Sequence, residues 1–240
     1  MIRAVLLDLG DTLFRLGPFP SDLEARIERA LGEAGVAAGE GAAAAALRGL
    51  RRAMDDVAAS PSSAEVNVAL AVAEALAGLG PATAATAGAL VERVVGEADV
   101  SRFLDGHLTP PVLRRLRALG LRLVAVSNTV TPPRLITGHP VAEQPLAELD
   151  AMVFSVSVGV RKPGAEIYRQ ALALAGVAPG EALFVGDRHR EDVAGPMAIG
   201  IRAVLTHQFR REPPGPGPQP LAVVKDLAEI EAIVVGMASG

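Results

Sequence analysis

The feature that most constrains the fold is a short apolar segment near the N-terminus that ends in an acidic residue. The segment Ile2–Leu7 is apolar apart from Arg3, and Asp8 follows it directly. A segment without polar alternation predicts a β-strand that is buried on both faces, as in parallel sheets covered by helices. We therefore expect this strand to lie inside the protein and to present Asp8 at its tip.

Similar segments recur later in the chain and alternate with amphipathic ones. The apolar segments predict strands at Leu121–Val126, Ala151–Val156, Ala182–Val185 and Ile201–Leu205. The amphipathic segments, each closed by a glycine, predict helices at Pro111–Leu119, Ala165–Ala175 and Glu191–Ile199. Alternating strands and helices are typical of βαβ units, so we expect an α/β protein with a doubly wound parallel sheet. In such a sheet the functional site lies at the carboxyl ends of the strands.

The region between the first two predicted strands shows helical patterns only. Four helices are expected there, at Asp22–Ala34, Ala42–Ala58, Ala64–Leu79 and Ala82–Glu97. We therefore expect residues 17–103 to form an inserted four-helix domain, and residues 1–16 and 104–240 to form the α/β core. The helix at Ala64–Leu79 has few polar side chains, so it either lies at the centre of the insert or forms a homodimer surface.

Composition restricts the partners and the chemistry. The chain of 240 residues has a net charge of −4, which argues against nucleic acid or an anionic membrane surface as the main partner. It has no cysteine, which excludes disulfides, thiolate metal sites and a cysteine nucleophile. No apolar run reaches the roughly 18 residues of a membrane span, and no signal peptide pattern is present. A cytoplasmic protein is therefore expected.

Polar or charged residues stand at or near four predicted strand ends. They are Asp8, Ser127, Lys162 and Asp187, and Lys162 is one of only two lysines, the other being Lys225. A single acid after a strand is often only a helix cap. Because the carboxyl ends of parallel strands meet at one edge, the four together predict a site. The loop Phe209–Pro220, with five prolines and two glycines, is expected to be a surface connection.

Four segments in this order resemble the signature motifs of the haloacid dehalogenase-like hydrolases. They are VLLDLGDTL around Asp8, RLVAVSNT around Ser127, GVRKPGAEIY around Lys162 and LFVGDRHREDVAG around Asp187. The resemblance implies that Asp8 is the catalytic nucleophile and that Lys162 steadies the phosphoryl group. It also implies that the helical insert is the cap domain, which closes over the site and selects the substrate.

The resemblance further implies a magnesium site and a phosphate site. The metal ligands would be Asp8, the Gly10 carbonyl, Asp187 and Asp192. The phosphate would be held by Ser127 and Lys162, with Asn128 and the backbone amides near Asp11 as additional donors.

This ligand set suits phosphoryl transfer. Two anions repel each other, so a cation is needed between a carboxylate and a phosphate, and Mg²⁺ prefers such oxygen ligands. The expected function is a Mg²⁺-dependent phosphatase of a small phosphorylated metabolite, acting through an aspartyl-phosphate.

The chain departs from the family pattern at Gly10. Phosphatases of this family have a second aspartate there, which serves as the general acid and base. General acid–base catalysis contributes about 10²- to 10⁴-fold to the rate, and the glycine cannot supply it. Substrates whose leaving groups need no protonation would lose the least rate. Asp11 could replace it, although a role in bonding the turn is an alternative. His189 and Arg188 are another proton source, with a solvated loop histidine as the alternative for His189.

Other functions remain open to different degrees. Dehalogenases of this family work without metal, which disagrees with the acidic pair Asp187 and Asp192. The carbon–phosphorus hydrolases use a cap lysine, and residues 17–103 contain none. A phosphate-binding or regulatory protein with weak turnover is the third alternative. The sequence does not place the polar residues near the opening of the insert that would select the substrate, among them Arg15, Arg48, Arg51 and Arg52. For most of these arginines a solvated helix face is expected instead of anion binding.

Overall fold

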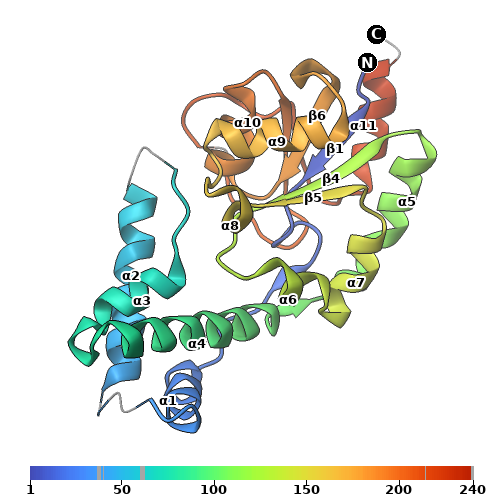
Figure 1. Ribbon diagram of the computed structural model, residues 1–240. Helices are drawn as coiled ribbons and strands as arrows, with labels where there is room; N and C mark the ends of the chain where they lie inside the picture. The colour runs from blue at the N-terminus through green and yellow to red at the C-terminus, as the bar shows by residue number, and fades with distance from the viewer. Residues whose placement is uncertain (37–38, 40, 60–62, 214, 239–240) are drawn as a thin grey trace.

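The computed structural model describes all residues except 37–38, 40, 60–62, 214 and 239–240. Its centre is a six-stranded sheet in which every strand pair is parallel, with the order β5-β4-β1-β6-β7-β8 (Figure 1). The strands are β1 Ala4–Leu7, β4 Arg122–Ser127, β5 Ala151–Phe154, β6 Ala182–Gly186, β7 Arg202–Thr206 and β8 Ala222–Val224. The predicted α/β parallel sheet is confirmed.

The strand β1 lies in the middle of the sheet, between β4 and β6, and all four of its residues are buried. Its last residue, Leu7, pairs with Ala125 on β4 and with Val185 on β6. The residues that follow these three strands therefore emerge at one edge of the sheet. This register brings together Asp8 and Asp187, which lie far apart in the sequence.

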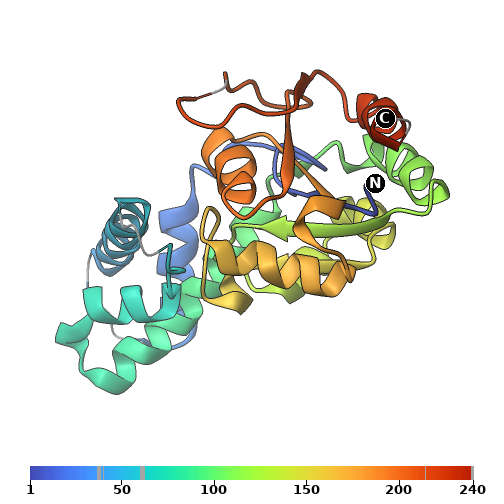
Figure 2. The ribbon, with the colours of Figure 1, turned by 90° about the horizontal axis from the view of Figure 1, so that it is seen from above.

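Helices cover both faces of the sheet (Figures 1 and 2). The alternating residues of β1 divide between two cores: Val5 and Leu7 belong to one, Ala4 and Leu6 to the other. Helices α5 Pro110–Ala118, α7 Pro140–Ala147 and α11 Glu229–Ala238 contribute to the first core. Helices α9 Ala165–Ala175 and α10 Gly195–Met197 contribute to the second. This two-sided burial explains why the strand lacks polar alternation.

The region between β1 and β4 forms a helical insert that projects to one side of the sheet (Figures 1 and 2). Its helices are α1 Leu23–Glu33, α2 Ala42–Ala59, α3 Val68–Ala75 and α4 Pro81–Val100. They pack around a separate core that includes Ile27, Val72 and Val91. Our prediction of one helix over Ala64–Leu79 was too long. Asn67 caps α3 by accepting a hydrogen bond from the Leu70 N–H at 2.9 Å, and the last turn is a 3₁₀-helix at Ala77–Leu79.

Several contacts attach the insert to the core, and one of them is the hydrogen bond that Thr131 Oγ1 donates to Asp99 Oδ2 of α4 at 2.7 Å. The chain enters and leaves the insert through a short antiparallel pair, β2 Arg15–Leu16 with β3 Phe103–Leu104. A further attachment, here called the tether, joins residues 63–65 of the insert to residues 159–161 of the core. It includes a β-bridge between Ala64 and Val160.

The tether also contains a partly buried ion pair. The Arg161 N–H donates to the Ser63 carbonyl at 2.7 Å, and the Arg161 guanidinium lies 2.5 Å from Glu65 Oε1. The side chain of Glu65 is only 4% exposed. The backbone of residues 63–65 is bonded to residues 159–161 and cannot be helical at the same time. For this reason α3 begins later than the apolar pattern predicts.

The predicted helix at Glu191–Ile199 also differs from the structure. A π-helix covers His189–Ala194, and the short α10 follows it. The remaining short helices are α6 Pro133–Thr137, α8 Ser155–Val158, a 3₁₀ turn at Gly106–Leu108 and another at Pro179–Glu181. Within the described ranges, the structure has no helix that is both long enough and apolar enough to cross a membrane.

Candidate active site

Three of the four residues predicted at or near strand ends line one cavity of about 310 Å³. Asp8 follows β1 and Ser127 ends β4, and both line this cavity together with Lys162. Asp187 follows β6 and is buried beside them. The cavity lies at the carboxyl edge of the sheet, where parallel α/β folds place their sites.

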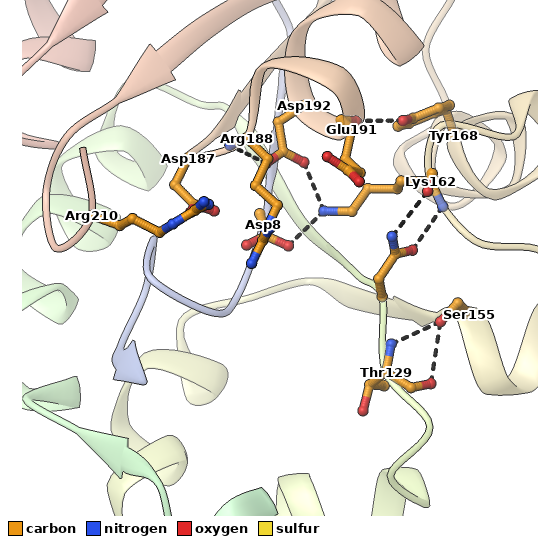
Figure 3. A network of polar contacts seen from close by, with 11 residues as sticks. Asp8, Thr129, Ser155, Lys162, Tyr168, Asp187, Arg188, Glu191, Asp192 and Arg210 are labelled. Carbon is orange, nitrogen blue, oxygen red and sulfur yellow. Dashed lines mark hydrogen bonds and ion pairs between the residues drawn. The ribbon is translucent and has the colours of Figure 1, made fainter. Parts of the chain in front are cut away.

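Lys162 forms the centre of the charged network (Figure 3). Its Nζ lies 2.5 Å from Asp8 Oδ1 and 2.8 Å from Asp192 Oδ1, and its side chain is 2% exposed. A buried ammonium is costly unless it is paired and hydrogen-bonded. The two carboxylates therefore hold Lys162 in a defined position next to Asp8.

The backbone of Lys162 is held by Asn128. The Lys162 N–H donates to Asn128 Oδ1 at 2.7 Å, and Asn128 Nδ2 donates to the Lys162 carbonyl at 3.0 Å. The loop after Asn128 is fixed in turn, because the Thr129 N–H donates to Ser155 Oγ at 2.8 Å (Figure 3). Asn128 thus positions the lysine, in addition to lining the cavity.

Three buried carboxylates could hold a metal ion. Asp8, Asp187 and Asp192 each offer an oxygen, and these oxygens lie within 4.8 Å of one another. A buried set of oxygen ligands suits a hard divalent cation such as Mg²⁺. The wide turn of the π-helix carries Asp192 into this set, and its Oδ2 accepts a hydrogen bond from the Arg188 N–H at 2.9 Å.

The buried charges shift one another's pKa values. Burial raises the pKa of Asp8 to about 8; Asp192 and Asp187 add to this, and Lys162 opposes it. Burial and Asp192 raise the pKa of Asp187 to about 6, and Arg210 opposes this shift. Burial alone would lower the pKa of Lys162, but its ion pairs with Asp192 and Asp8 raise it. Asp8 therefore holds a proton near neutral pH, and a bound divalent cation would replace it.

Sequence reasoning did not identify Arg210. Its Nη1 lies 3.0 Å from Asp187 Oδ2, and its Nη2 lies 2.8 Å from Glu212 Oε2. Arg210 comes from the proline-rich loop, which was expected to be only a surface connection. No local pattern marks this arginine, because its contact with Asp187 depends on how the loop folds back over the end of β6.

The proline-rich loop also buries His189. This side chain is 4% exposed, and its Nε2 lies 2.9 Å from the Pro218 carbonyl. The solvated loop histidine was therefore a wrong expectation. His189 is also absent from the residues that line the cavity, so the structure gives no support to its alternative role as a proton source.

The turn after Asp8 places Asp11 and Leu16 together. Asp11 has a positive φ of 56°, its N–H donates to the Phe14 carbonyl, and its Oδ1 accepts from the Leu16 N–H at 2.9 Å. Asp11 thus bonds the turn while it also lines the cavity. A Cβ atom at Gly10 would lie 2.7 Å from Leu16 Cδ1. Leu16 therefore occupies the space that a side chain at position 10 would need.

Other arginines than those considered from the sequence reach the cavity. Arg15 pairs with Asp105 at 2.7 Å, and the remaining three candidates are exposed on α2, namely Arg48, Arg51 and Arg52. The cavity is lined instead by Arg102, Arg161 and Arg188. Arg102 and Arg161 come from segments that adjoin the insert, so only the folded arrangement could show their place.

Comparison with known proteins identifies the family. The model of the haloacid dehalogenase-like hydrolases matches residues 2–200. The chain therefore belongs to the haloacid dehalogenase-like hydrolases. The structure agrees, since a 2-haloacid dehalogenase from Pseudomonas syringae pv. tomato DC3000 superposes with a TM-score of 0.73 at 21% identity, covering 99% of this chain and 100% of that one. A HAD phosphatase from Thermococcus onnurineus gives 0.62 at 21% identity, covering 98% and 99%.

Relatives of this hydrolase include named phosphatases. It is 36% identical over 118 residues to a phosphoserine phosphatase of Thermus thermophilus, covering 49% of this chain and 46% of the relative. It is 33% identical over 138 residues to the human haloacid dehalogenase-like hydrolase domain-containing protein 3, covering 57% and 49%. The chain thus spans about half the length of these curated relatives. The family shows that the chain is a hydrolase, and one of these relatives is named a phosphatase.

Proposed function

We propose that this hydrolase is a Mg²⁺-dependent phosphatase of small phosphorylated metabolites. The observation that carries the proposal is the buried cluster of Asp8, Asp187 and Asp192 beside Lys162. The three acids need a cation to bind a phosphate, and their oxygen atoms suit Mg²⁺. Relatives named phosphoserine phosphatase and glyceraldehyde 3-phosphate phosphatase support the reaction class.

In this proposal Asp8 attacks the phosphorus atom of the bound ester. The bond to the leaving oxygen breaks, the alkoxide takes a proton from water and departs as an alcohol, and an aspartyl-phosphate remains on Asp8. Water then attacks this phosphorus and releases inorganic phosphate, which restores the Asp8 carboxylate. Mg²⁺, when bound, would neutralise charge between Asp8 and the phosphoryl oxygens. Asp8, Asp187 and Asp192 would hold it, with the Gly10 carbonyl.

Lys162 and Ser127 would hold the other phosphoryl oxygens. Lys162 already lies next to Asp8, and its position is fixed by Asp192 and Asn128. A positioned ammonium forms charge-assisted hydrogen bonds to a phosphate and stabilises charge that spreads over its oxygens. Ser127 lines the same cavity with its hydroxyl at the end of β4. The helical insert, residues 17–103, would act as the cap that selects substrates.

The proposal is tested by hydrolysis of p-nitrophenyl phosphate with Mg²⁺ and with EDTA. We expect activity only with Mg²⁺, and its loss in Asp8→Asn. The matched control is Asp55→Asn, which changes an exposed aspartate on α2. Circular dichroism shows that each variant is folded. Unchanged turnover in Asp8→Asn, or equal turnover in EDTA, contradicts the proposal.

A phosphate-binding or regulatory role is the second candidate. It is favoured by one observation, the contact that Leu16 would make with any side chain at position 10. This arrangement leaves no side-chain acid at the position where phosphatases of the family carry one. The protein would then keep the phosphate site but protonate alkoxide leaving groups slowly. A dehalogenase is not favoured, because the buried acidic cluster suits a metal site.

A further inference from the structure

Among the described residues, four cationic side chains line the cavity, and three of them are committed to partners. Lys162 binds Asp8 and Asp192. Arg102 donates to the Gly17 carbonyl at 2.7 Å and pairs with Asp99 at 2.7 Å, and Arg161 pairs with Glu65 in the tether. The fourth cation is Arg188.

Arg188 differs from the others because its guanidinium makes no hydrogen bond or ion pair within the part of the chain that the structure describes. Its backbone is nevertheless fixed, since the Arg188 N–H donates to Asp192 Oδ2 at 2.9 Å and the preceding Asp187 is 1% exposed. The side chain is exposed and lines the same cavity as Asp8. Figure 3 shows it extending from the end of β6 in the direction of Asp8.

We propose that Arg188 binds a second anionic group of the substrate, so that the site takes phosphate esters that also carry a carboxylate or a second phosphate. Arginine presents a planar fork of donors that matches both kinds of anion. The inference rests on the proposed function, because it assumes that the first phosphate lies at Asp8. The new element is the assignment of the second anion to Arg188.

The cavity limits the size of this substrate. Its volume of about 310 Å³ is at the lower end for small-molecule sites. Phe14, Leu16, Phe103 and Ile136 line the cavity as well, so a short carbon chain fits between the two anionic groups. The carboxylate of Glu191 lines the cavity too and repels anions that Arg188 does not hold. A compact molecule with one extra anionic group is therefore expected.

The test compares substrates that differ only in the second group. D-3-phosphoglycerate and glycerol 3-phosphate share three carbons but differ in a carboxylate against a hydroxymethyl group. Propane-1,3-diol bisphosphate and 3-hydroxypropyl phosphate differ in the second phosphate. We expect wild-type kcat/KM to favour the more anionic member of at least one pair by about 10-fold or more, since charged hydrogen bonds of this kind have that effect. The pair that shows the preference identifies whether Arg188 binds a carboxylate or a second phosphate.

The decisive variant is Arg188→Gln. We expect it to reduce the preference within the responding pair by about 10-fold or more, mainly through KM. Arg188→Lys should restore part of the preference, because it keeps the charge without the fork. The matched control is Arg190→Gln, an exposed arginine in the π-helix that follows Arg188, which does not line this cavity. It should keep the wild-type preference.

Binding separates this inference from the proposed function. The dissociation constants of both pairs are measured by calorimetry in Asp8→Asn with Mg²⁺, with and without Arg188→Gln. A preference that depends on Arg188 supports the subsite even if the wild type hydrolyses nothing, which would defeat only the phosphatase proposal. Equal binding within both pairs, or an equal loss from Arg188→Gln and Arg190→Gln, overturns the inference.

Discussion

The guanidinium of Arg210 lies 3.0 Å from Oδ2 of Asp187, so an arginine from a distant loop is paired with a candidate metal ligand. The side chain of Asp187 is 2% exposed and that of Arg210 is 34% exposed. The Arg210 guanidinium therefore competes for the Asp187 carboxylate with any metal ion that binds the acidic cluster. Arg210 therefore affects how tightly the acidic cluster holds a metal.

We predict that Arg210→Gln tightens Mg²⁺ binding roughly two- to fivefold at pH 8, as expected for a partly exposed ion pair. At this pH protons compete only weakly for Asp187, because its pKa is raised only to about 6, and proton binding at Asp8 is common to both proteins. Calorimetric titration with Mg²⁺ measures the change. Arg211→Gln, a substitution of the neighbouring exposed arginine, is the control. Weaker binding in Arg210→Gln would instead show that Arg210 orients Asp187.

The raised pKa of Asp8 predicts how stability depends on pH. The group titrates near 3.8 when unfolded and near 8 in the folded, metal-free protein. Between these values the folded state keeps a proton that the unfolded state has released. Raising the pH therefore lowers the free energy of unfolding, by at most about 1.4 kcal/mol per pH unit for each such proton. Asp187 adds to this effect below its pKa of about 6.

Urea unfolding in EDTA at several pH values between 5 and 8 measures this slope. We expect it to flatten in Asp8→Asn and to persist in the control Asp55→Asn. Added Mg²⁺ should stabilise the protein most at the upper end of this range, where fewer protons compete for the carboxylates. A stability that rises with pH in EDTA contradicts the burial argument for Asp8.

A third prediction concerns Gly10 and Leu16. Replacing Gly10 with Asp supplies a general acid, and we expect a rise of tens-fold or more in kcat/KM for glycerol 3-phosphate. Because Leu16 Cδ1 lies 2.7 Å from the new Cβ position, Gly10→Asp combined with Leu16→Ala should exceed Gly10→Asp alone. The rise for p-nitrophenyl phosphate should be smaller, since its leaving group needs less protonation.

Leu16→Ala alone is the control for the double variant, because Leu16 lines the cavity. If the double variant binds phosphate but gains no turnover over this control, the scaffold lacks more than a proton donor. That outcome favours the binding or regulatory role.

A fourth prediction concerns Asn128 as a positioning residue. Asn128→Ala removes two hydrogen bonds to the backbone of Lys162, and we expect a loss of roughly 1–3 kcal/mol in stability and at least a 10-fold loss in kcat. Asn128→Asp keeps the acceptor for the Lys162 N–H but loses the donor. It should therefore be intermediate in stability. Equal stability of all three proteins by urea unfolding contradicts this role.

A fifth prediction concerns the tether. Glu65→Gln removes the charge that pairs with Arg161, and we expect the insert to separate more readily from the core. Small-angle scattering should show a larger radius of gyration, and protease should cut faster at residues 63–67. Glu74→Gln changes an exposed glutamate on α3 and serves as the control. An unchanged scattering curve contradicts a role for the Glu65–Arg161 ion pair in holding the insert against the core.

Five strands of the central sheet, their parallel arrangement and the edge at which the site lies follow from local patterns in the sequence, whereas β8 was not predicted. Ile2–Leu7 has no polar alternation because β1 is buried on both faces, and this places Asp8 at the sheet edge. Ser127, Lys162 and Asp187 follow from their motifs. A local pattern is sufficient for these residues, because an apolar run indicates a buried strand and the residue after it stands at the carboxyl end of that strand.

Only the tertiary structure revealed the partners of these residues. Arg210 lies on Asp187, Glu65 pairs with Arg161, and His189 is buried under the proline-rich loop. Each contact joins segments that lie far apart in the sequence, and no local pattern in either segment indicates the other. Their meeting depends on loop paths and on side-chain packing between elements. Sequence by itself therefore determined the sheet and the position of its site, whereas the fold decided which charges surround that site, because charges act through space and not along the chain.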